Sequence, residues 1–362
     1  MLFGILSCTA SVCAFAELQP RMGAPEFPKN PIWCGLQGQQ APTLKSLRGK
    51  VILIDFWDYT CINCVRTFPH LKGWYERYHA LGLEIIGVHK GEFGFASVPE
   101  NVQLAYERFQ LPYPTIIDVK DVMWRAYDCT AWPVSFLIDR HGYIQEVHQG
   151  EGSYSRFEKE IQVALKQGHP EVDISRLPIT AEGPISGPDC GLATPEIYVG
   201  YARANLWSGG IANKEGFHRN KVVAYAPTAR RVPKGFFTEG RWLNEADAFE
   251  SVGGSEQGEA ASLGITYRGR EVYAVLGRSS KEPVDVVVTR DGQAIPVSAR
   301  GKDVHTDAGG NTVITIDAPR MYYVIAREDS GTHELKFTPK SAGVQICSFT
   351  FGNRCLEDCD HK

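Results

Sequence analysis

Residues 50–69 constrain the fold of this chain more than any other stretch, because they join a buried strand to a helix through a pair of cysteines. Residues 51–57 form a near-continuous apolar run with the length and β-branched content of a strand buried on both faces. From Val65 onward the apolar residues fall three or four positions apart, which is the spacing of one helix face. Cys61 and Cys64 are therefore expected between the end of a strand and the beginning of a helix.

The predicted position of the two cysteines favours a sulfur anion. The first backbone N–H groups of a helix are unpaired and lie at the positive end of the helix dipole, so they stabilise negative charge. A thiolate is such an anion, and it is the nucleophile of thiol–disulfide exchange. We expect Cys61, at the helix start, to be the nucleophile, and Cys64, one turn further in, to resolve the mixed disulfide.

Two other uses of a Cys-x-x-Cys pair fit this sequence less well. A zinc ribbon needs a second pair at similar spacing, and the nearest candidates, Cys355 and Cys359, lie at the far end of the chain. A covalent haem needs a histidine directly after the second cysteine, and Val65 stands there. We therefore interpret the pair as a redox-active disulfide, Cys61–Cys64, which needs no further cofactor and no metal.

The composition describes a globular protein. The 362 residues are 43% hydrophobic and 22% charged, and the length is sufficient for two domains of ordinary size. A net charge of -4 without a long basic run argues against nucleic acid as a partner. Proteins or small molecules are the expected partners.

The N-terminus predicts export. Residues 1–16 are apolar and uncharged and end on a small-x-small cleavage pattern, which is typical of a signal peptide, although no Lys or Arg precedes the apolar core. A lipid anchor at Cys8 and a retained anchor are the alternatives. Of the ten cysteines, eight remain without Cys8 and Cys13, and an even number fits an oxidising compartment. We expect a periplasmic or otherwise extracytoplasmic protein, soluble after signal removal.

Residues 17–166 alternate between strand and helix patterns around the cysteine pair. After the strand at 51–57 and the helix that begins near Val65, we expect four more strands, at 84–89, 115–118, 134–139 and 143–149. We expect three more helices, at 99–109, 122–127 and 154–165. This order predicts an α/β domain, a mixed sheet with helices on both faces.

The second half is all-β in its pattern. Residues 167–188 are rich in Pro and Gly and predict a linker. Within 189–353, short apolar or alternating runs separated by turn signals predict strands at 221–226, 262–267, 271–276, 284–289, 312–316, 321–326, 333–337 and 344–351. Strands spaced in this way predict a two-sheet sandwich, followed by a cysteine-containing tail at 354–362.

With these features in place, residues 33–166 resemble a TlpA-like thioredoxin-fold domain, and are most similar to the soluble C-terminal part of DipZ-type thiol:disulfide interchange proteins. The residues that carry the resemblance are 55–57, 61–64, Pro69, 87–93, Trp132-Pro133, 136–139 and 150–154. The second half resembles the C-terminal part of the same proteins, a galactose-binding-like, carbohydrate-binding jelly roll. Its matching residues are 194–203, 240–242 and 349–352.

The resemblance implies roles for two carboxylates. Asp55 matches the buried acid beneath the cysteines of thioredoxins, which helps to remove the proton from the resolving thiol, and burial beside a thiolate should raise its pKa. Glu92 matches a loop carboxylate near the pair that tunes the acidity of the thiols or their proton supply. The alternative for Asp55 is a strand-end residue that accepts hydrogen bonds from backbone donors, and the alternative for Glu92 is a solvated loop acid.

The resemblance also implies a substrate-binding face. Pro133 matches the cis-proline opposite the cysteine pair, whose neighbouring backbone pairs with the peptide of a bound protein. Trp132, Tyr59 and Trp57 are candidates for an apolar platform beside it. The alternative for each is core packing, which we favour for Trp57.

The chain departs from the DipZ pattern in two respects. It lacks the membrane-embedded electron-transfer domain, which implies a separate membrane electron donor of the DsbD or CcdA kind, or an oxidising role. Cys129 lies shortly before Pro133, and either a bridge to Cys34 or a third redox thiol would explain it; we favour the bridge. Pairings of the remaining cysteines stay open, as does a metal site in the tail. These residues are Cys190, Cys347, Cys355, Cys359 and, for a metal, His361.

The leading hypothesis is an exported thiol–disulfide oxidoreductase that exchanges disulfides with protein substrates through Cys61 and Cys64, in a direction that the sequence leaves open. The alternative is a module that binds an envelope glycan or protein, with the redox domain secondary. Tyr198, Tyr201, Arg203 and Trp242 have the chemistry to grip a sugar, or to pack a sandwich core. A thiol peroxidase is disfavoured, because no Pro-x-x-x-Thr-x-x-Cys motif is present.

Overall fold

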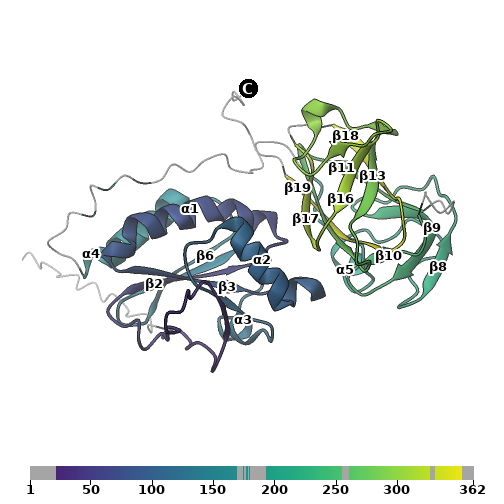
Figure 1. The fold of residues 1–362 in the computed structure, drawn as a ribbon. Coiled ribbons are helices and arrows are strands. Elements are labelled where there is room, and N and C mark those ends of the chain that lie inside the picture. The colour runs from purple at the N-terminus through teal and green to yellow at the C-terminus, as the bar shows by residue number, and fades with distance from the viewer. Residues whose placement is uncertain are drawn as a thin grey trace, which may run out of the picture.

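The computed structural model describes residues 22–168, 174, 177, 179, 193–254, 261–326 and 331–352. They form an α/β part and an all-β part that lie side by side (Figure 1). The predicted signal peptide, most of the predicted linker and the cysteine tail lie outside the described residues, and so do Cys8, Cys190, Cys355 and Cys359.

A six-stranded mixed sheet organises the N-terminal part. Its elements are β1 (Ile32–Cys34), β2 (Val51–Trp57), α1 (Ile62–Tyr78), β3 (Leu83–His89), α2 (Pro99–Phe109), β4 (Thr115–Ile117), α3 (Val122–Ala126), β5 (Val134–Ile138), β6 (Ile144–Gln149) and α4 (Tyr154–Lys166). The strand order is β1-β4-β3-β2-β5-β6, in which β2, β3 and β4 run parallel and the other neighbours antiparallel. The predicted order of strands and helices is confirmed, and β1 is an additional edge strand.

The central strand β2 is buried along its whole length because both faces of the sheet are covered. Leu53 and Trp57 enter a core shared with α1, α2 and α4, whereas Ile54 and Phe56 enter a second core with α3 on the other face. Successive side chains of a strand point to opposite faces, so a strand between two cores is apolar almost throughout. By the same alternation Asp55 faces α1.

The C-terminal part is a sandwich of two antiparallel sheets with one short helix. Its elements are β7 (Ile197–Tyr198), α5 (Ala204–Trp207), β8 (Val222–Tyr225), β9 (Phe236–Asn244), β10 (Phe249–Ser251), β11 (Ser262–Arg268), β12 (Glu271–Arg278), β13 (Val284–Arg290), β14 (Gln293–Ala294), β15 (His305–Thr306), β16 (Thr312–Ile316), β17 (Arg320–Ile325), β18 (Thr332–Pro339) and β19 (Val344–Gly352). One sheet follows the order β15-β16-β13-β18-β11-β9 and the other β9-β10-β19-β12-β17. All eight predicted strands are present, and the pattern missed β9, β10 and the two-residue strands β7, β14 and β15.

Strand β9 belongs to both sheets because it bends at Gly240. Residues 236–239 pair with β11 and residues 240–243 pair with β8, while residues 242–244 pair with β10 of the same second sheet. Gly240 has φ +82°, a left-handed conformation that glycine adopts without steric cost. A strand that changes sheets needs such a bend, so this glycine forms a corner of the sandwich.

Gly240→Ala is expected to lower the free energy of unfolding by about 1–2 kcal/mol, because a Cβ disfavours the left-handed conformation. Urea denaturation of the full chain measures the change. Gly73→Ala on α1 is the control, since Gly73 has open space around its Cβ position and should lose no stability. Equal losses in the two variants would contradict the role assigned to the corner.

The two parts share one packed interface. Tyr273 and Val275 of β12, Met321 of β17 and Cys347 of β19 belong to the same apolar core as α1 and α4. The guanidinium of Arg66, on α1, reaches across to Glu271 of β12 at 2.7 Å. The side of the N-terminal part that carries α1 therefore packs against the sandwich.

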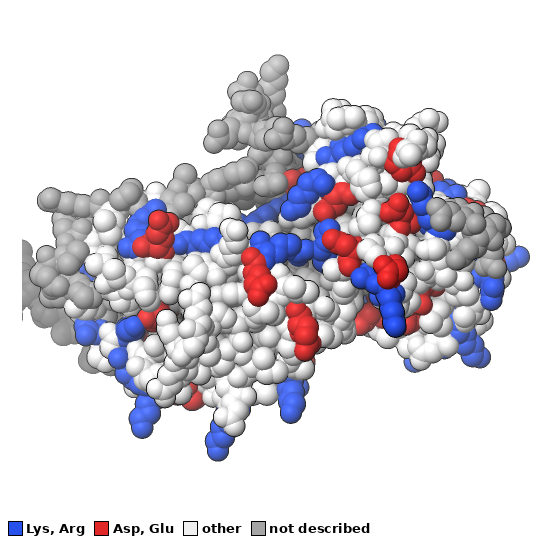
Figure 2. All heavy atoms as spheres, in the orientation of Figure 1, with Lys and Arg blue, Asp and Glu red and all other residues white. Residues whose placement is uncertain are grey.

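The surface carries charges of both signs. Blue and red side chains are interspersed on the face in Figure 2, without a broad field of one sign. Within the described ranges, no helix combines the length and the apolar character needed to cross a bilayer.

Candidate active site

Cys61 is the N-cap residue of α1, and its Sγ accepts a hydrogen bond from the backbone N–H of Cys64 at 3.3 Å. The helix begins at Ile62, so the sulfur lies at the end where N–H groups are unpaired. Unpaired N–H groups at a helix N-terminus favour negative charge, so the position suits a sulfur that attacks a disulfide. The side chain is half-buried and lines a pocket, so a substrate sulfur has access to it.

Cys64 lies one turn further along α1 and has no exposed surface. Burial raises the pKa of this thiol well above its ordinary value, and the hydrogen bond and charge of Cys61 act in the same direction. Both thiols are free in this structure. The geometry therefore separates an accessible sulfur from a buried one that needs a base before it can attack.

Asp55 lies fully buried on the face of β2 that points towards α1. Its Oδ1 accepts a hydrogen bond from Ser135 Oγ at 2.7 Å, and its Oδ2 has no hydrogen-bond partner among the described residues. Burial raises the pKa of Asp55 to about 7, although the hydrogen bond from Ser135 works against the rise. The charge of Asp55 also raises the pKa of Cys64, so the two groups influence each other electrostatically.

A buried carboxylate that the sequence analysis missed organises the turn before α1. Asp58 accepts hydrogen bonds from Thr60 Oγ1 at 2.6 Å and from the backbone N–H of Glu92 at 2.9 Å, and it lies 3.3 Å from His89 Nε2. Although burial opposes ionisation, hydrogen bonding and the charge of His89 hold the pKa of Asp58 below its ordinary value. Asp58 thereby ties the cysteine turn to the loop after β3.

The signal for this contact was present in the sequence. Trp57 and His89 are register partners at the ends of the parallel strands β2 and β3. The carboxyl ends of neighbouring parallel strands meet at one edge of the sheet, so polar residues there lie close together. An Asp and a His at two such ends are candidates for pairing.

Glu92 lies on the loop after β3, and its carboxylate points towards the sandwich. Its Oε1 accepts hydrogen bonds from Tyr198 at 2.7 Å and Arg203 at 2.7 Å. Burial raises the pKa of Glu92 to about 7, and the charge of Arg203 opposes this rise. The side chain is 17% exposed and lines the same pocket as Cys61, so it is not a solvated loop acid.

The remaining predicted site residues lie at different depths. The Trp132–Pro133 peptide bond is cis, as the resemblance implied, and Trp132 lines the pocket beside Cys61. Tyr59 is only 1% exposed and stacks on His89 with ring centroids 5.4 Å apart. It therefore lies beneath the site and not on its surface. Trp57 is fully buried in the core.

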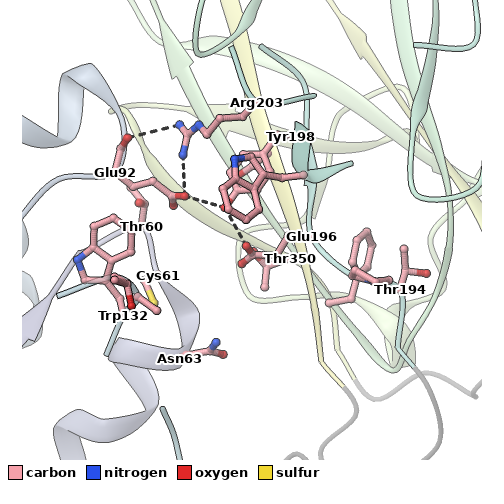
Figure 3. A pocket seen from close by; sticks show the side chains of 16 residues that line it. Thr60, Cys61, Asn63, Glu92, Trp132, Thr194, Glu196, Tyr198, Arg203 and Thr350 are labelled. Atoms are coloured by element: carbon pink, nitrogen blue, oxygen red, sulfur yellow. Dashed lines mark hydrogen bonds and ion pairs between the residues drawn. The ribbon is translucent and has the colours of Figure 1, made fainter. Parts of the chain in front are cut away.

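Both parts of the chain form the pocket around Cys61 (Figure 3). Its volume is about 640 Å³. The N-terminal part supplies the cysteine turn, Glu92 and the loop before Pro133, and the sandwich supplies β7, α5 and β19. The lining residues are Thr60, Cys61, Asn63, Glu92, Thr130, Ala131, Trp132, Thr194, Pro195, Glu196, Tyr198, Arg203, Trp207, Ser348, Thr350 and Phe351.

The residues considered for sugar binding have other positions. Trp242 is fully buried in the sandwich core. Tyr198 and Arg203 contact Glu92, and the hydroxyl of Tyr201 donates to Asn220 at 3.2 Å. The burial of Trp242 favours core packing over sugar binding for this residue.

The predicted bridge between Cys34 and Cys129 is wrong, because both thiols are free. Cys34 packs into the core on one face of the sheet and Cys129 into the core on the other. The sheet itself separates them. Burial raises the pKa of Cys129 to about 12, which makes it a poor nucleophile.

Two protein families and several relatives of known name match this chain. Residues 20–147 match the AhpC/TSA family, and residues 194–352 match a family described as thioredoxin-like C-terminal domain. Protein DipZ of Mycobacterium tuberculosis is 32% identical over 337 residues, which are 93% of this chain and 44% of that protein. The chain therefore spans less than half the length of this relative.

Two shorter relatives each match between a third and two fifths of this chain. Thiol-disulfide oxidoreductase ResA of Geobacillus thermodenitrificans is 34% identical over 128 residues, which are 35% of this chain and 67% of that protein. ResA of Geobacillus kaustophilus is 31% identical over 140 residues, which are 38% of this chain and 74% of that protein.

Proposed function

The chain belongs to the TlpA- and DipZ-like family of thioredoxin-fold proteins, and we propose that it is an exported thiol–disulfide oxidoreductase that exchanges disulfides with protein substrates. The observation that carries this proposal is the hydrogen bond from the helix N-terminus to Cys61 Sγ, beside a buried second thiol. The names of its relatives, DipZ and thiol-disulfide oxidoreductase ResA, support the same reaction class.

In the proposed first step, the Cys61 thiolate is the nucleophile, and the substrate disulfide lies in the pocket. The thiolate attacks one sulfur of this disulfide, the substrate S–S bond breaks, and a mixed disulfide forms between Cys61 and the substrate. The second substrate sulfur leaves as a thiolate and takes a proton. Glu92 lines the pocket and is a group that can hold this proton near neutral pH.

In the second step, Cys64 releases the substrate. Asp55 accepts the proton of the Cys64 thiol, and the resulting thiolate attacks Cys61 Sγ. As the Cys61–Cys64 disulfide forms, the bond between Cys61 and the substrate breaks, and the substrate sulfur leaves as a thiolate that takes a proton from solvent, so that both substrate sulfurs are reduced. Two electrons have then moved from the protein to the substrate, and a dithiol donor must return them.

The compartment and the electron donor follow from the same proposal. Export rests on the signal-like residues 1–16 and on the family, and a separate membrane donor of the DsbD or CcdA kind would supply electrons in the reducing direction. The pocket walls suit a polypeptide disulfide, with Trp132, Trp207 and Phe351 available for apolar contact.

The test is reduction of insulin disulfides by the full chain with dithiothreitol as the reductant. Catalysed reduction is expected, and Cys61→Ser should lower the catalysed rate by on the order of 10³-fold or more, since it removes the nucleophile. Insulin reduction at the same rate by the wild type and Cys61→Ser would contradict the proposal.

A further inference from the structure

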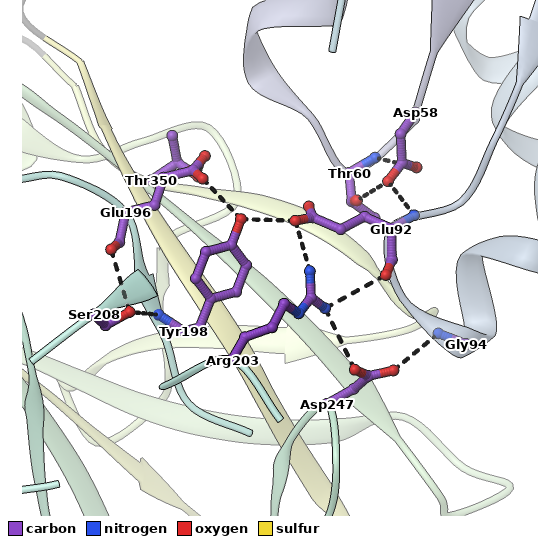
Figure 4. Close-up of polar contacts among 10 residues, drawn as sticks. All are labelled: Asp58, Thr60, Glu92, Gly94, Glu196, Tyr198, Arg203, Ser208, Asp247 and Thr350. Atoms are coloured by element: carbon purple, nitrogen blue, oxygen red, sulfur yellow. Dashed lines mark hydrogen bonds and ion pairs between the residues drawn. The ribbon is translucent and has the colours of Figure 1, made fainter. Parts of the chain in front are cut away.

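The carboxylate of Glu92 is held by the other domain. Tyr198 and Arg203, both from the sandwich, donate to its Oε1, and the second guanidinium nitrogen of Arg203 lies 3.4 Å from the backbone carbonyl oxygen of Glu92 (Figure 4). Within the described part of the chain, no side chain of the N-terminal domain donates to this carboxylate. Its position beside the Cys61 pocket therefore depends on the sandwich.

Arg203 is itself fixed in one orientation. Its guanidinium lies 4.5 Å from the ring centroid of Phe93 and 4.6 Å from that of Tyr198. The same group lies 3.4 Å from Asp247, whose other oxygen accepts the backbone N–H of Gly94 at 3.3 Å. A planar guanidinium can stack on two rings and donate in two directions at once, and an ammonium group cannot do so. This site therefore requires arginine.

The hydroxyl of Tyr198 links two carboxylates. It lies 2.7 Å from Glu92 Oε1 and 2.9 Å from Glu196 Oε2. A hydroxyl has one proton, so Tyr198 donates it either to Glu92 or to Glu196 and not to both at once. Both carboxylates line the pocket that contains Cys61, so this shared proton lies at the wall of the redox site.

We propose that Arg203 and Tyr198 are positioning residues of the redox site, which hold the Glu92 carboxylate at the Cys61 pocket and favour its ionised form. This inference rests on the proposed disulfide exchange, because it gives both residues a part in that reaction. The charged groups that face Glu92 are Arg203, which stabilises its negative charge, and Glu196 and Asp58, which oppose it. The sandwich then completes the catalytic unit.

The test compares wild type, Arg203→Gln, Arg203→Lys and Tyr198→Phe in two measurements. The first is the ¹³C NMR titration of the Glu92 carboxyl group, assigned by its loss in Glu92→Gln. The midpoint is expected to rise by about one to two pH units in Arg203→Gln and by less in Tyr198→Phe. In Arg203→Lys it should lie between the midpoints of the wild type and Arg203→Gln, because lysine keeps the positive charge but not the planar contacts. The second is the pH profile of kcat/KM for insulin reduction. One limb of this profile should disappear in Glu92→Gln, and in the other variants the midpoint of that limb should shift by as much as the midpoint of the Glu92 titration.

The control is Arg219→Gln. Arg219 is exposed on the sandwich and stacks on Tyr201, with the guanidinium 5.4 Å from the ring centroid, so both measurements should stay unchanged. An unmoved Glu92 titration in Arg203→Gln would overturn the proposal, whatever the turnover. A moved titration with an unmoved pH profile would also overturn it, because the residues would then tune a carboxylate that the reaction does not use. Absence of wild-type turnover would contradict the proposed function, while the titration would still report on Arg203.

Discussion

A Cys64→Ser variant is expected to stop turnover and to accumulate as a mixed disulfide between Cys61 and the substrate. The half-buried Cys61 can still attack, but the buried thiol that releases the substrate is gone. Turnover should fall by on the order of 10³-fold or more. Non-reducing electrophoresis and mass spectrometry after incubation with oxidised insulin measure the trapped complex.

The matched control for trapping is the Cys61→Ser, Cys64→Ser double variant. It should lose the complex that Cys64→Ser accumulates, because Cys34, Cys129 and Cys347, the other cysteines that the structure describes, are all buried. Capture of substrate by the double variant, or by Cys61→Ser alone in the same amount as by Cys64→Ser, would show that another thiol is the nucleophile.

Asp55→Asn is expected to change activity and stability in opposite directions. The resolving step should slow by about 10²-fold, because Cys64 loses the group that accepts its proton. The folded protein should become more stable at alkaline pH, because the wild type must then hold a buried carboxylate with one unpartnered oxygen. Single-turnover kinetics and urea denaturation measure the two effects.

The pH window of the stability effect follows from the raised pKa of Asp55, about 7 in the folded protein against 3.8 ordinarily. Between these values the folded protein keeps a proton that the unfolded chain has released, so wild-type stability falls as pH rises through this range. Asparagine does not titrate, so the advantage of Asp55→Asn should grow by about 2 to 3 kcal/mol between pH 5 and pH 8.

The control for this effect is Asp128→Asn, which changes an exposed acid in a left-handed turn where asparagine is equally suited. Its stability difference from the wild type should not vary between pH 5 and pH 8. A constant difference for Asp55→Asn as well would show that Asp55 does not titrate between pH 5 and pH 8, which would contradict the raised pKa on which its role as proton acceptor rests.

The parts of this protein that the sequence predicted are those with local causes. The apolar run of β2, the helical spacing after it and the cysteines between them follow from neighbouring residues, and all were found in the structure. The same reasoning missed β9, because Glu239, Gly240 and Arg241 interrupt its pattern at the point where it changes sheets. A bend that joins two sheets is set by tertiary packing.

The parts that the sequence did not predict depend on contacts between distant residues. Tyr198 and Arg203 are 106 and 111 positions from Glu92, and only the packing of the two domains brings them together. The predicted Cys34–Cys129 bridge failed for a related reason, because nearness to the motif says nothing about which face of the sheet a residue occupies. Burial of Tyr59 beneath the site was likewise invisible to local reasoning.

The most direct test of the account is a redox titration of the full chain in glutathione buffers, with the state of each thiol read by alkylation and peptide mapping. Among the five cysteines that the structure describes, a single two-electron transition is expected, in which Cys61 and Cys64 form one disulfide while Cys34, Cys129 and Cys347 stay reduced. A pair that stays reduced in every buffer, or a disulfide that joins either cysteine to a different partner, would contradict it.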